Sequence, residues 1–287
     1  MKKQIKRIIG KYNCRLLSCL LYKKTFHKKL NLKAPQEFNE KLMWLKLTNY
    51  NKNKLVWECS DKFLVRKYLM SKGIKEENLP KILKVYNNTN EINFEELPNR
   101  FALKCTHGCG YNIICDNKNK LNNEKTIQKL AKWQKEKFGY DSAENHYTHI
   151  KPKIICEEYI DSNIGFPYDY KIYCFSGVPK LILVCSEREK KLRLNFFDLQ
   201  WNELMIGKSE YRNTMKILKP KNLKSMISMA KKISSDFPFV RIDFYDNGKA
   251  IIGEMTFTPA ACLATYYNDE GNMYLASLLN LNQKYEK

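Results

Sequence analysis

Two carboxylates near the C-terminal end of the sequence are spaced so that they can share one divalent cation. Asp243 and Glu254 lie in β-rich runs on either side of Asn247-Gly248, a pair that favours a type I′ hairpin turn. Such a hairpin makes the two acids diagonal neighbours on adjacent strands. Their chemistry suits Mg²⁺, which proteins usually hold with one or two carboxylates and the phosphates of a substrate.

The same hairpin predicts which side chains accompany the two acids. Because side chains alternate along a strand, Arg241 and Thr256 are expected on the same face as the acids. The predicted register pairs Tyr245 with Ala250, Asp243 with Ile252, and Arg241 with Glu254. The opposite face is apolar and is expected in the core: Val240, Ile242, Phe244, Ile251, Met255 and Phe257. The alternative is a solvated hairpin face that carries only an Arg241–Glu254 ion pair.

A glycine-bearing loop between two predicted strands, within residues 100–115, is a second candidate site. Gly108 and Gly110 would let the backbone N–H groups of the loop turn toward phosphate oxygens. Lys104 points away from the apolar layer of its strand and would supply a counter-charge. The alternative is an ordinary hairpin in which glycine only relieves strain. The cysteines and the histidine of this stretch lack the paired spacing of a zinc site.

The elements around these residues predict an α+β fold in two lobes. Helices are expected over 35–47, from about Ser60 to Gly73, and over 122–138 and 222–235. Strands are expected over 82–86, on both sides of the glycine loop, over 153–160, and in a hairpin of 168–175 with 180–185. In that last hairpin, Asp169 and Lys171 share one face.

Composition narrows the class of protein. The chain has 287 residues, of which 44% are hydrophobic and 13% aromatic, which is enough for a packed core. Ten cysteines are too sparse for a disulfide scaffold and are expected to be reduced thiols in a cytoplasmic protein. The net charge of +21 favours anionic partners, such as nucleic acid, anionic lipid, nucleotide phosphates or an acidic saccharide. It can also simply reflect an AT-rich genome.

The N-terminal segment is basic and amphipathic. Apolar residues between Ile5 and Leu21 follow helical spacing, with lysines and arginines between them. Two outcomes are open: the helix packs on the domain, or it rests on an anionic membrane. No run approaches the roughly 18 apolar residues of a spanning helix, and a signal peptide is not expected.

The order of these motifs along the chain resembles the ATP-grasp superfamily, and within it the TupA-like group. The order is Lys104 before the glycine loop, Glu157-Glu158-Tyr159-Ile160, Asp169-Tyr170-Lys171, Arg241-Ile242-Asp243, and the run from Gly253 to Pro259. The resemblance also includes the helix at Phe38 and the stretch from Asp61 to Arg66, and it runs from about Pro35 to Asn272. It implies an ATP-grasp domain over 35–272 that clamps a nucleotide between two α+β lobes, with a boundary near 157–162. A basic helical extension (1–34) precedes this domain, and a helical tail (273–287) follows it.

The resemblance implies ATP and Mg²⁺ as cofactors and assigns roles to named residues. The nucleotide residues would be the phosphate-binding Lys104, the flexible cover at Gly108 and Gly110, and the adenine-side hinge of Glu157, Glu158, Tyr159 and Ile160. Asp243, Glu254 and Thr256 would hold the metal, and Lys171 and Arg241 would neutralise phosphate or the acyl phosphate. Thr256 stands where the superfamily usually has Asn, and Thr258 and Ala260 replace an Arg and a Gly that often follow.

The implied activity is an ATP-dependent carboxylate–amine ligase that forms an amide through an acyl phosphate and releases ADP in bacterial surface-polysaccharide biosynthesis. Its partners would be ATP, a uronate-type saccharide or other carboxylate acceptor, and an amine. A peripheral contact with the inner face of an anionic membrane is open, and no specific nucleic acid is expected. The alternatives are a kinase or glycosyltransferase of the same pathway, and a non-enzymatic polyanion-binding module.

Overall fold

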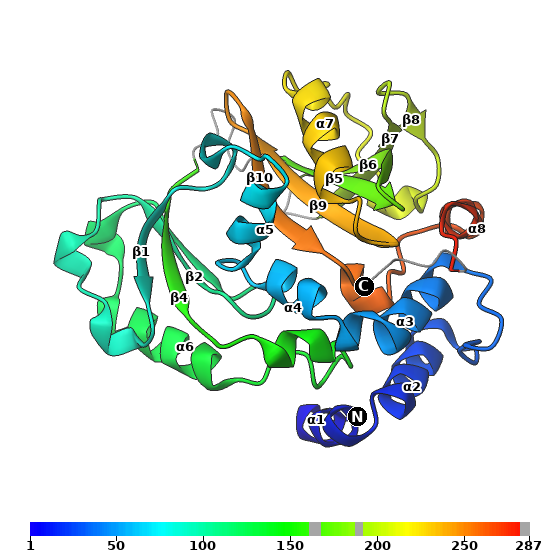
Figure 1. The fold of residues 1–287 in the computed structure, drawn as a ribbon, viewed down its shortest axis with the longest axis horizontal. Coiled ribbons are helices and arrows are strands. Elements are labelled where there is room, and N and C mark those ends of the chain that lie inside the picture. The colour runs from blue at the N-terminus through cyan, green and yellow to red at the C-terminus, as the bar shows by residue number, and fades with distance from the viewer. Residues whose placement is uncertain (161–167, 187–191, 282–287) are drawn as a thin grey trace.

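Two antiparallel β-sheets form the framework of the chain in the computed structural model, which describes residues 1–160, 168–186 and 192–281 (Figure 1). The first sheet has the order β1-β4-β2-β3, with β1 (Ile82–Tyr86), β2 (Phe101–Cys105), β3 (Asn112–Cys115) and β4 (Ile154–Glu158). The second has the order β10-β9-β5-β6-β7-β8, with β5 (Asp169–Phe175), β6 (Val178–Ser186), β7 (Arg193–Asp198), β8 (Glu203–Leu204), β9 (Phe239–Asp246) and β10 (Ala250–Thr256). This arrangement confirms the predicted α+β class.

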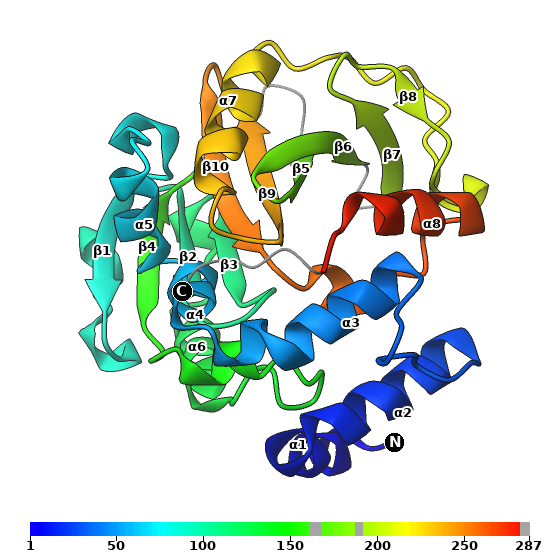
Figure 2. The same ribbon diagram turned by 45° about the vertical axis from the view of Figure 1, so that its right-hand side comes forward.

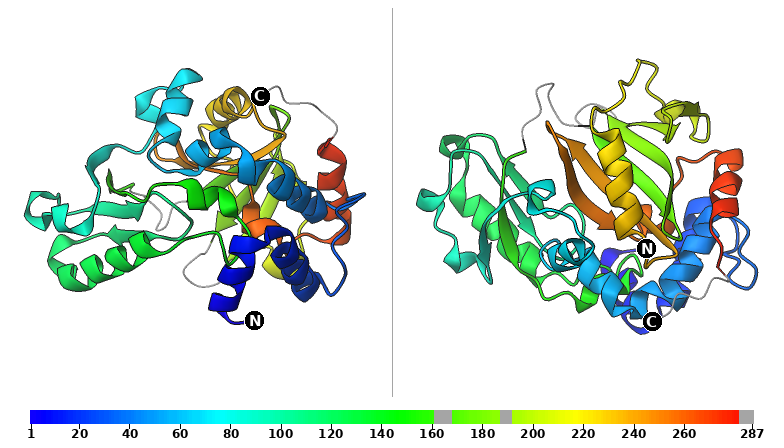
Figure 3. Two further views of the ribbon diagram at one scale, coloured as in Figure 1. Left: turned by 60° about the horizontal axis from the view of Figure 1, so that its bottom comes forward. Right: turned by 45° about the horizontal axis from the view of Figure 1, so that its top comes forward.

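Eight α-helices surround the sheets in the described part of the chain. They are α1 (Lys3–Tyr12), α2 (Cys14–Phe26), α3 (Phe38–Thr48), α4 (Lys54–Ser60), α5 (Val65–Ser71), α6 (Asn123–Lys135), α7 (Leu223–Ile233) and α8 (Asp269–Leu278). The predicted helices over 35–47, 122–138 and 222–235 are confirmed as α3, α6 and α7. Figure 3 shows α7, in yellow, lying across the second sheet. Among the described residues, no helix is long and apolar enough to cross a membrane.

The helix predicted from about Ser60 to Gly73 is found only from Val65 to Ser71, as α5, so its predicted start is wrong. The Asp61 carboxylate accepts the backbone N–H groups of Phe63 and Leu64 at 2.7 and 2.9 Å, so the chain turns between α4 and α5. A short acidic side chain offers the backbone a local alternative to helical hydrogen bonds. Asn13 divides the N-terminal helix into α1 and α2 in a similar way, since its side chain accepts from the N–H of Leu16 at 2.8 Å.

Each sheet has its own hydrophobic core. The larger core lies at the second sheet and includes Phe38 of α3, whose ring is 5.3 Å from that of Phe239 and 5.9 Å from that of Phe175. The smaller core belongs to the first sheet, where Phe101 and Leu103 are fully buried. Two separate cores allow the two sheets to face one another across a site that neither core fills.

The predicted lobe boundary and the two terminal segments can be compared with the elements of the structure. The chain leaves the first sheet at Glu158 and enters the second at Asp169, and residues 161 and 162 of the predicted boundary lie outside the described residues. α1 and α2 lie at one edge of the molecule, where α2 contacts α3 (Figure 2). α8 begins at Asp269, before the predicted tail, and residues 282–287 of that tail are not described.

The β9–β10 hairpin differs from the prediction in its turn and its register. Asp246 pairs with Ala250, so the loop has three residues, of which only Gly248 has a positive φ, 71°. The expected type I′ turn is therefore wrong, because it requires two residues with positive φ.

This one-residue shift reverses the faces of the residues next to the loop. Ile252 lies in the core opposite Phe244, whereas Ile251, expected in the core, lines a cavity on the other face. A bulge at Gly253 then shifts the register by one more residue. Met255 and Phe257 therefore return to the core, as predicted.

Candidate functional site

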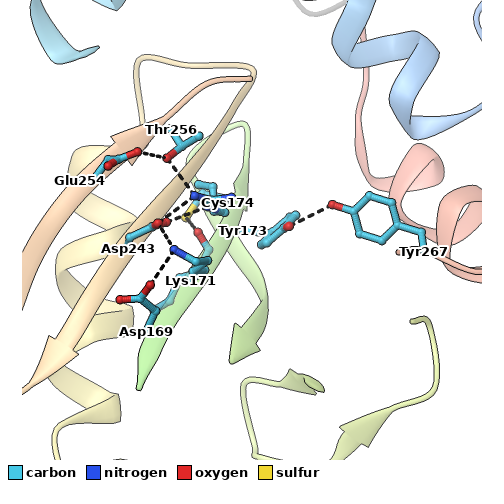
Figure 4. Close-up of polar contacts among 10 residues, drawn as sticks. Asp169, Lys171, Tyr173, Cys174, Asp243, Glu254, Thr256 and Tyr267 are labelled. Carbon is cyan, nitrogen blue, oxygen red and sulfur yellow. Dashed lines mark hydrogen bonds and ion pairs between the residues drawn. The ribbon is translucent and has the colours of Figure 1, made fainter. Parts of the chain in front are cut away.

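Three neighbouring strands of the second sheet bring five polar side chains together (Figure 4). Lys171 of β5 pairs with Asp243 of β9, and Glu254 of β10 pairs with Asp243 from the other side. Thr256 pairs with Arg241 one step further along the same face. The predicted diagonal relationship of the two acids is wrong in detail, because the bulge places them directly opposite each other.

Asp243 is the centre of this group. Arg241 donates from Nε to Oδ1 at 2.7 Å and from Nη2 to Oδ2 at 2.8 Å, and Lys171 donates from Nζ to the same Oδ2. Burial raises the pKa of Asp243, but the charges of Arg241 and then Lys171 outweigh it, so the pKa lies below its usual value. The Asp243 carboxylate is therefore ionised in a buried position.

Thr256 connects Arg241 to Glu254. Its hydroxyl accepts from Arg241 Nη2 at 3.1 Å and donates to Glu254 Oε1 at 3.0 Å. The structure thus places the threonine between the arginine and the second acid, where it orients the Glu254 carboxylate.

Asp169 extends the group on β5, and the predicted site did not include it. Its Oδ2 lies 3.3 Å from Lys171 Nζ, so this buried lysine has carboxylates on two sides. The sequence did place Asp169 beside Lys171, because side chains two residues apart lie on the same face of a strand.

Two further lysines reach the site, Lys104 from the first sheet and Lys62 from the turn between α4 and α5. Lys104 of β2 binds Glu157 of β4, with Nζ 2.5 Å from Oε2, because the two residues are diagonal neighbours on one face. Lys62, which the predicted site did not include, donates from Nζ to the carbonyl of Gly108 at 2.5 Å. Its sequence signal was its place in the stretch from Asp61 to Arg66, which is part of the family resemblance.

The two loop glycines are required for different reasons. Gly108 has a φ of 92°, and an added Cβ would lie 2.5 Å from the ring of Phe138. Gly110 has a φ of 76° but open space around it, so only its backbone conformation favours glycine.

A cavity of about 670 Å³ joins the contributions of both sheets. Its lining includes Lys62, Lys104, Gly110, Asp169, Lys171, Arg241, Asp243 and Glu254. Four cations and three carboxylates give this lining a small positive excess, which suits a phosphate group accompanied by a metal ion. Gly108 and Thr256 contact lining residues instead of lining the cavity themselves.

The predicted hinge lies at a second cavity of about 760 Å³. Glu158, Tyr159 and Ile160 line it, and the guanidinium of Arg100 lies 4.0 Å from the centre of the Tyr159 ring. Glu157 lines a third cavity, of only about 20 Å³, which lies between the other two. This small cavity shares lining residues with the cavity of about 670 Å³ (Lys62, Gly253 and Glu254). It also shares lining residues with the cavity of about 760 Å³ (Arg66, Leu79 and Pro80). The predicted phosphate-binding Lys104 and the predicted hinge residues therefore line neighbouring cavities.

A strained turn borders the first cavity. Ala260, Ala261 and Cys262 have φ values of 50°, 56° and 64°, the left-handed region that alanine rarely adopts, and Ala260 lines the cavity. Lys46, which is fully buried, donates to the carbonyl of Ala261 at 3.4 Å.

A buried glutamate supports the residue just before this turn. Glu144 accepts from Thr258 Oγ1 at 2.6 Å and from Ser142 Oγ at 2.7 Å. Burial raises the pKa of Glu144, although the charge of Lys46 acts in the opposite direction. The sequence alone did not reveal this network, because its members lie far apart along the chain.

The residues present fit a magnesium ion bound together with phosphates. Asp243 and Glu254 supply two facing carboxylates, and among the described residues no three His, Cys, Asp or Glu side chains are arranged to hold a metal by themselves. Mg²⁺ commonly binds with one or two carboxylates and completes its octahedron with water and substrate phosphates. The cationic lining of the same cavity provides a place for those phosphates.

Comparison with known proteins gives one family. The sequence model of the TupA-like ATP-grasp family matches residues 40–280, most of the chain. No curated protein sequence matches the chain significantly.

Similar solved structures include three ligases or synthetases. D-alanine–D-alanine ligase from Bacillus anthracis has 15% identity and a TM-score of 0.42 over 70% of this chain and 59% of that chain. The ATP-grasp ligase PsnB, complexed with a minimal precursor, has 14% identity and a TM-score of 0.41 over 83% and 65%. D-cycloserine synthetase DcsG has 15% identity and a TM-score of 0.44 over 78% and 70%. The chain thus spans less than two thirds of the first two proteins.

Proposed function

The chain belongs to the TupA-like ATP-grasp family, and from this premise we propose that it is an ATP-dependent carboxylate–amine ligase. The carboxylate of one substrate attacks the terminal phosphate of ATP, which gives an acyl phosphate and ADP. An amine then attacks the acyl carbon, forms the amide and releases phosphate. The observation that carries the proposal is one cavity with two sets of charged side chains in its lining. Lys104 of the first sheet and Lys62 of the α4–α5 turn line it together with Lys171, Arg241, Asp243 and Glu254 of the second sheet.

The side chains of this cavity have distinct proposed roles. Lys62 of the α4–α5 turn and Lys104 of the first sheet bind phosphate oxygens. Lys171 and Arg241 stabilise the charge that develops on the transferring phosphoryl group. Asp243 and Glu254 would hold Mg²⁺, which neutralises phosphate charge when it is bound.

The protein needs no nucleophilic side chain for this reaction, because the substrate carboxylate is itself the nucleophile. The work of the chain is to position the reactants, neutralise charge and exclude water. Gly108 and Gly110 supply the loop over the phosphates, and Glu158, Tyr159 and Ile160 line the cavity assigned to adenine. Thr256 has the proposed role of orienting Glu254, because its hydroxyl donates to that carboxylate and accepts from Arg241. The two ionised carboxylates are stronger ligands for Mg²⁺ than a neutral hydroxyl.

The proposed carboxylate substrate is anionic, such as a uronate-type saccharide in the synthesis of a bacterial surface polysaccharide. The excess of basic residues over the whole chain and in the cavity lining supports this class of substrate. The turn at Ala260 borders the cavity and would contact this substrate.

The test is an ADP-release assay with MgATP, a panel of uronates and a panel of amines. ADP release that requires both a carboxylate and an amine supports the ligase, whereas release that needs no amine indicates a kinase. Asp243→Asn and Glu254→Gln should abolish turnover, and the exposed controls Asp116→Asn and Glu270→Gln should retain it. Steeply salt-dependent nucleic-acid binding without any response to MgATP would favour the polyanion-binding module instead.

A further inference from the structure

Exposed apolar side chains are concentrated on α1 and α2 and at Met1, which precedes them. The N-terminal apolar face consists of Met1, Ile5, Ile8, Tyr12, Leu16 and Leu20. These are six of the eighteen large hydrophobic side chains that are exposed in the described part of the chain, although they come from its first twenty residues. Ile8 is 60% exposed and Tyr12 is 77% exposed. Such a concentration differs from the scattered apolar residues of an ordinary surface and indicates an interaction site.

The longer N-terminal region that contains this apolar face, residues 1–36, carries about half of the net charge of the protein. Residues 1–36 contain nine lysines, two arginines and no acidic residue, a net charge of +11 out of +21 for the whole chain. The first acid in the sequence is Glu37. Basic residues therefore flank the N-terminal apolar face without acidic side chains from the same segment to neutralise them.

The inner side of α1 is fixed to the domain. Lys3 and Arg7 bind Glu136 Oε2 at 3.1 and 2.6 Å. Gly10 lies so close to the carbonyl of Tyr140 that an added Cβ would be 1.8 Å from its oxygen.

α2 is fixed in the same region, because Leu17 and Leu21 pack around the fully buried Ala143. Asn145 also donates from Nδ2 to the carbonyl of Gly10 at 3.1 Å. The two helices are therefore part of the folded body and lie at the edge of the molecule (Figure 1). The side chains of the N-terminal apolar face remain exposed.

We propose that α1 and α2 form a docking surface for an anionic phospholipid bilayer. Such a membrane offers both properties that the surface complements, since its headgroups attract the cations and its acyl boundary receives Ile8, Tyr12 and Leu16. Nucleic acid would satisfy the cations but leave the aliphatic side chains without a partner. A second copy of the chain would bring two strongly positive segments together, which their charges oppose.

Docking at this surface places the cavity at a fixed position relative to the bilayer. Glu136, which binds Lys3 and Arg7, also accepts from the Tyr111 hydroxyl at 3.0 Å. Tyr111 lines the cavity of about 670 Å³. The partly buried Glu136 side chain therefore connects the docking helix to the wall of the site. The docking surface itself does not depend on the proposed ligase activity.

The test is sedimentation of the full chain with phosphatidylcholine vesicles, with and without added phosphatidylglycerol. The wild type should bind only the anionic vesicles and should lose binding as salt increases. Ile8→Glu/Tyr12→Glu should weaken this binding by about tenfold or more, because the apolar side chains no longer enter the boundary region. The matched control is Met215→Glu/Leu218→Glu, which makes the same change at side chains that are 71% and 67% exposed elsewhere.

Charge is tested separately with Lys11→Gln/Arg15→Gln. Each removed cation should lower the vesicle affinity about fivefold. The control variant Lys216→Gln/Lys219→Gln removes the same number of positive charges from a distant exposed loop. It should bind the vesicles like the wild type. Circular dichroism and the unfolding temperature show whether each variant is folded.

Three results would overturn the proposal. The first is failure of the folded wild type to bind anionic vesicles, and the second is equal binding by the apolar variant and its control. The third is self-association of the wild type that Ile8→Glu/Tyr12→Glu abolishes, which would make this face a dimer interface. MgATP binding, measured in parallel, reports on the ligase site independently of these outcomes.

Discussion

Asp243 and Glu254 face each other directly across β9 and β10 because Gly253 is an extra residue in β10. Without this bulge the register near the turn would continue, and Glu254 would move to the core face of the sheet. Gly253 also has little room for a side chain, since an added Cβ would lie 2.7 Å from Cε2 of Tyr245. One glycine thus determines whether two carboxylates of this hairpin can share a metal ion.

Gly253→Ala should weaken MgATP binding by about tenfold, because the new methyl group displaces the Tyr245 ring that lines the cavity. Isothermal titration calorimetry measures the affinity. In a double-mutant cycle, Tyr245→Ala removes the clash, so the alanine at 253 should cost much less in that background. Equal costs in the two backgrounds would contradict the packing explanation.

Asp243→Asn should lower the free energy of unfolding by about 3 kcal/mol at neutral pH, because it leaves the buried Lys171 and the partly buried Arg241 without their shared carboxylate. The pKa of Asp243 is lower in the folded state than in the unfolded state, where it is about 3.9. Its ion pairs therefore stabilise the protein fully above this pH, and the stabilisation is lost as the pH falls through the folded pKa.

Urea unfolding from neutral pH downward, as far as the wild type stays folded, measures this dependence. The difference between wild type and Asp243→Asn should shrink as acid protonates Asp243, whereas the exposed control Asp116→Asn should stay close to the wild type throughout. A difference that stays constant over this range would show that the aspartate is not stabilised by its cationic partners.

Thr256→Val should lower the free energy of unfolding by about 2 kcal/mol, since the threonine hydroxyl bonds to two charged groups. It should also weaken MgATP binding, because Glu254 is no longer oriented. Thr256→Ser keeps the hydroxyl and should restore both properties. If the valine variant binds MgATP as tightly as wild type, the threonine does not orient the acid.

Lys62→Met should weaken MgATP binding by about tenfold or more, because it removes a charged hydrogen-bond donor from the cavity wall. Lys67, five residues further along the chain, is exposed, so Lys67→Met makes the same change outside the cavity. The two variants are compared by calorimetric titration with MgATP. Similar affinities for both would remove Lys62 from the proposed nucleotide site.

Most of the secondary structure could be predicted from local patterns. Local periods of two or 3.6 residues predict the strands on both sides of the glycine loop and the amphipathic helices α6 and α7. They also predict that Asp169 and Lys171 share one strand face, as do Arg241 and Asp243. The order of the motifs also predicted the family that the sequence comparison identified. The turn chemistry was less reliable, since Asn247-Gly248 suggested a two-residue loop where three residues are found.

The sequence by itself determined the α+β class, the family, and which side chains of one strand share a face, because these follow from local patterns and from the order of short motifs along the chain. Only the tertiary structure decided that Glu254 lies opposite Asp243, that Lys62 joins Lys104, and that Glu144 supports Thr258. Each of these depends on a strand register or on contacts between distant segments. Such contacts are set by packing of the whole chain, which no local period of the sequence encodes.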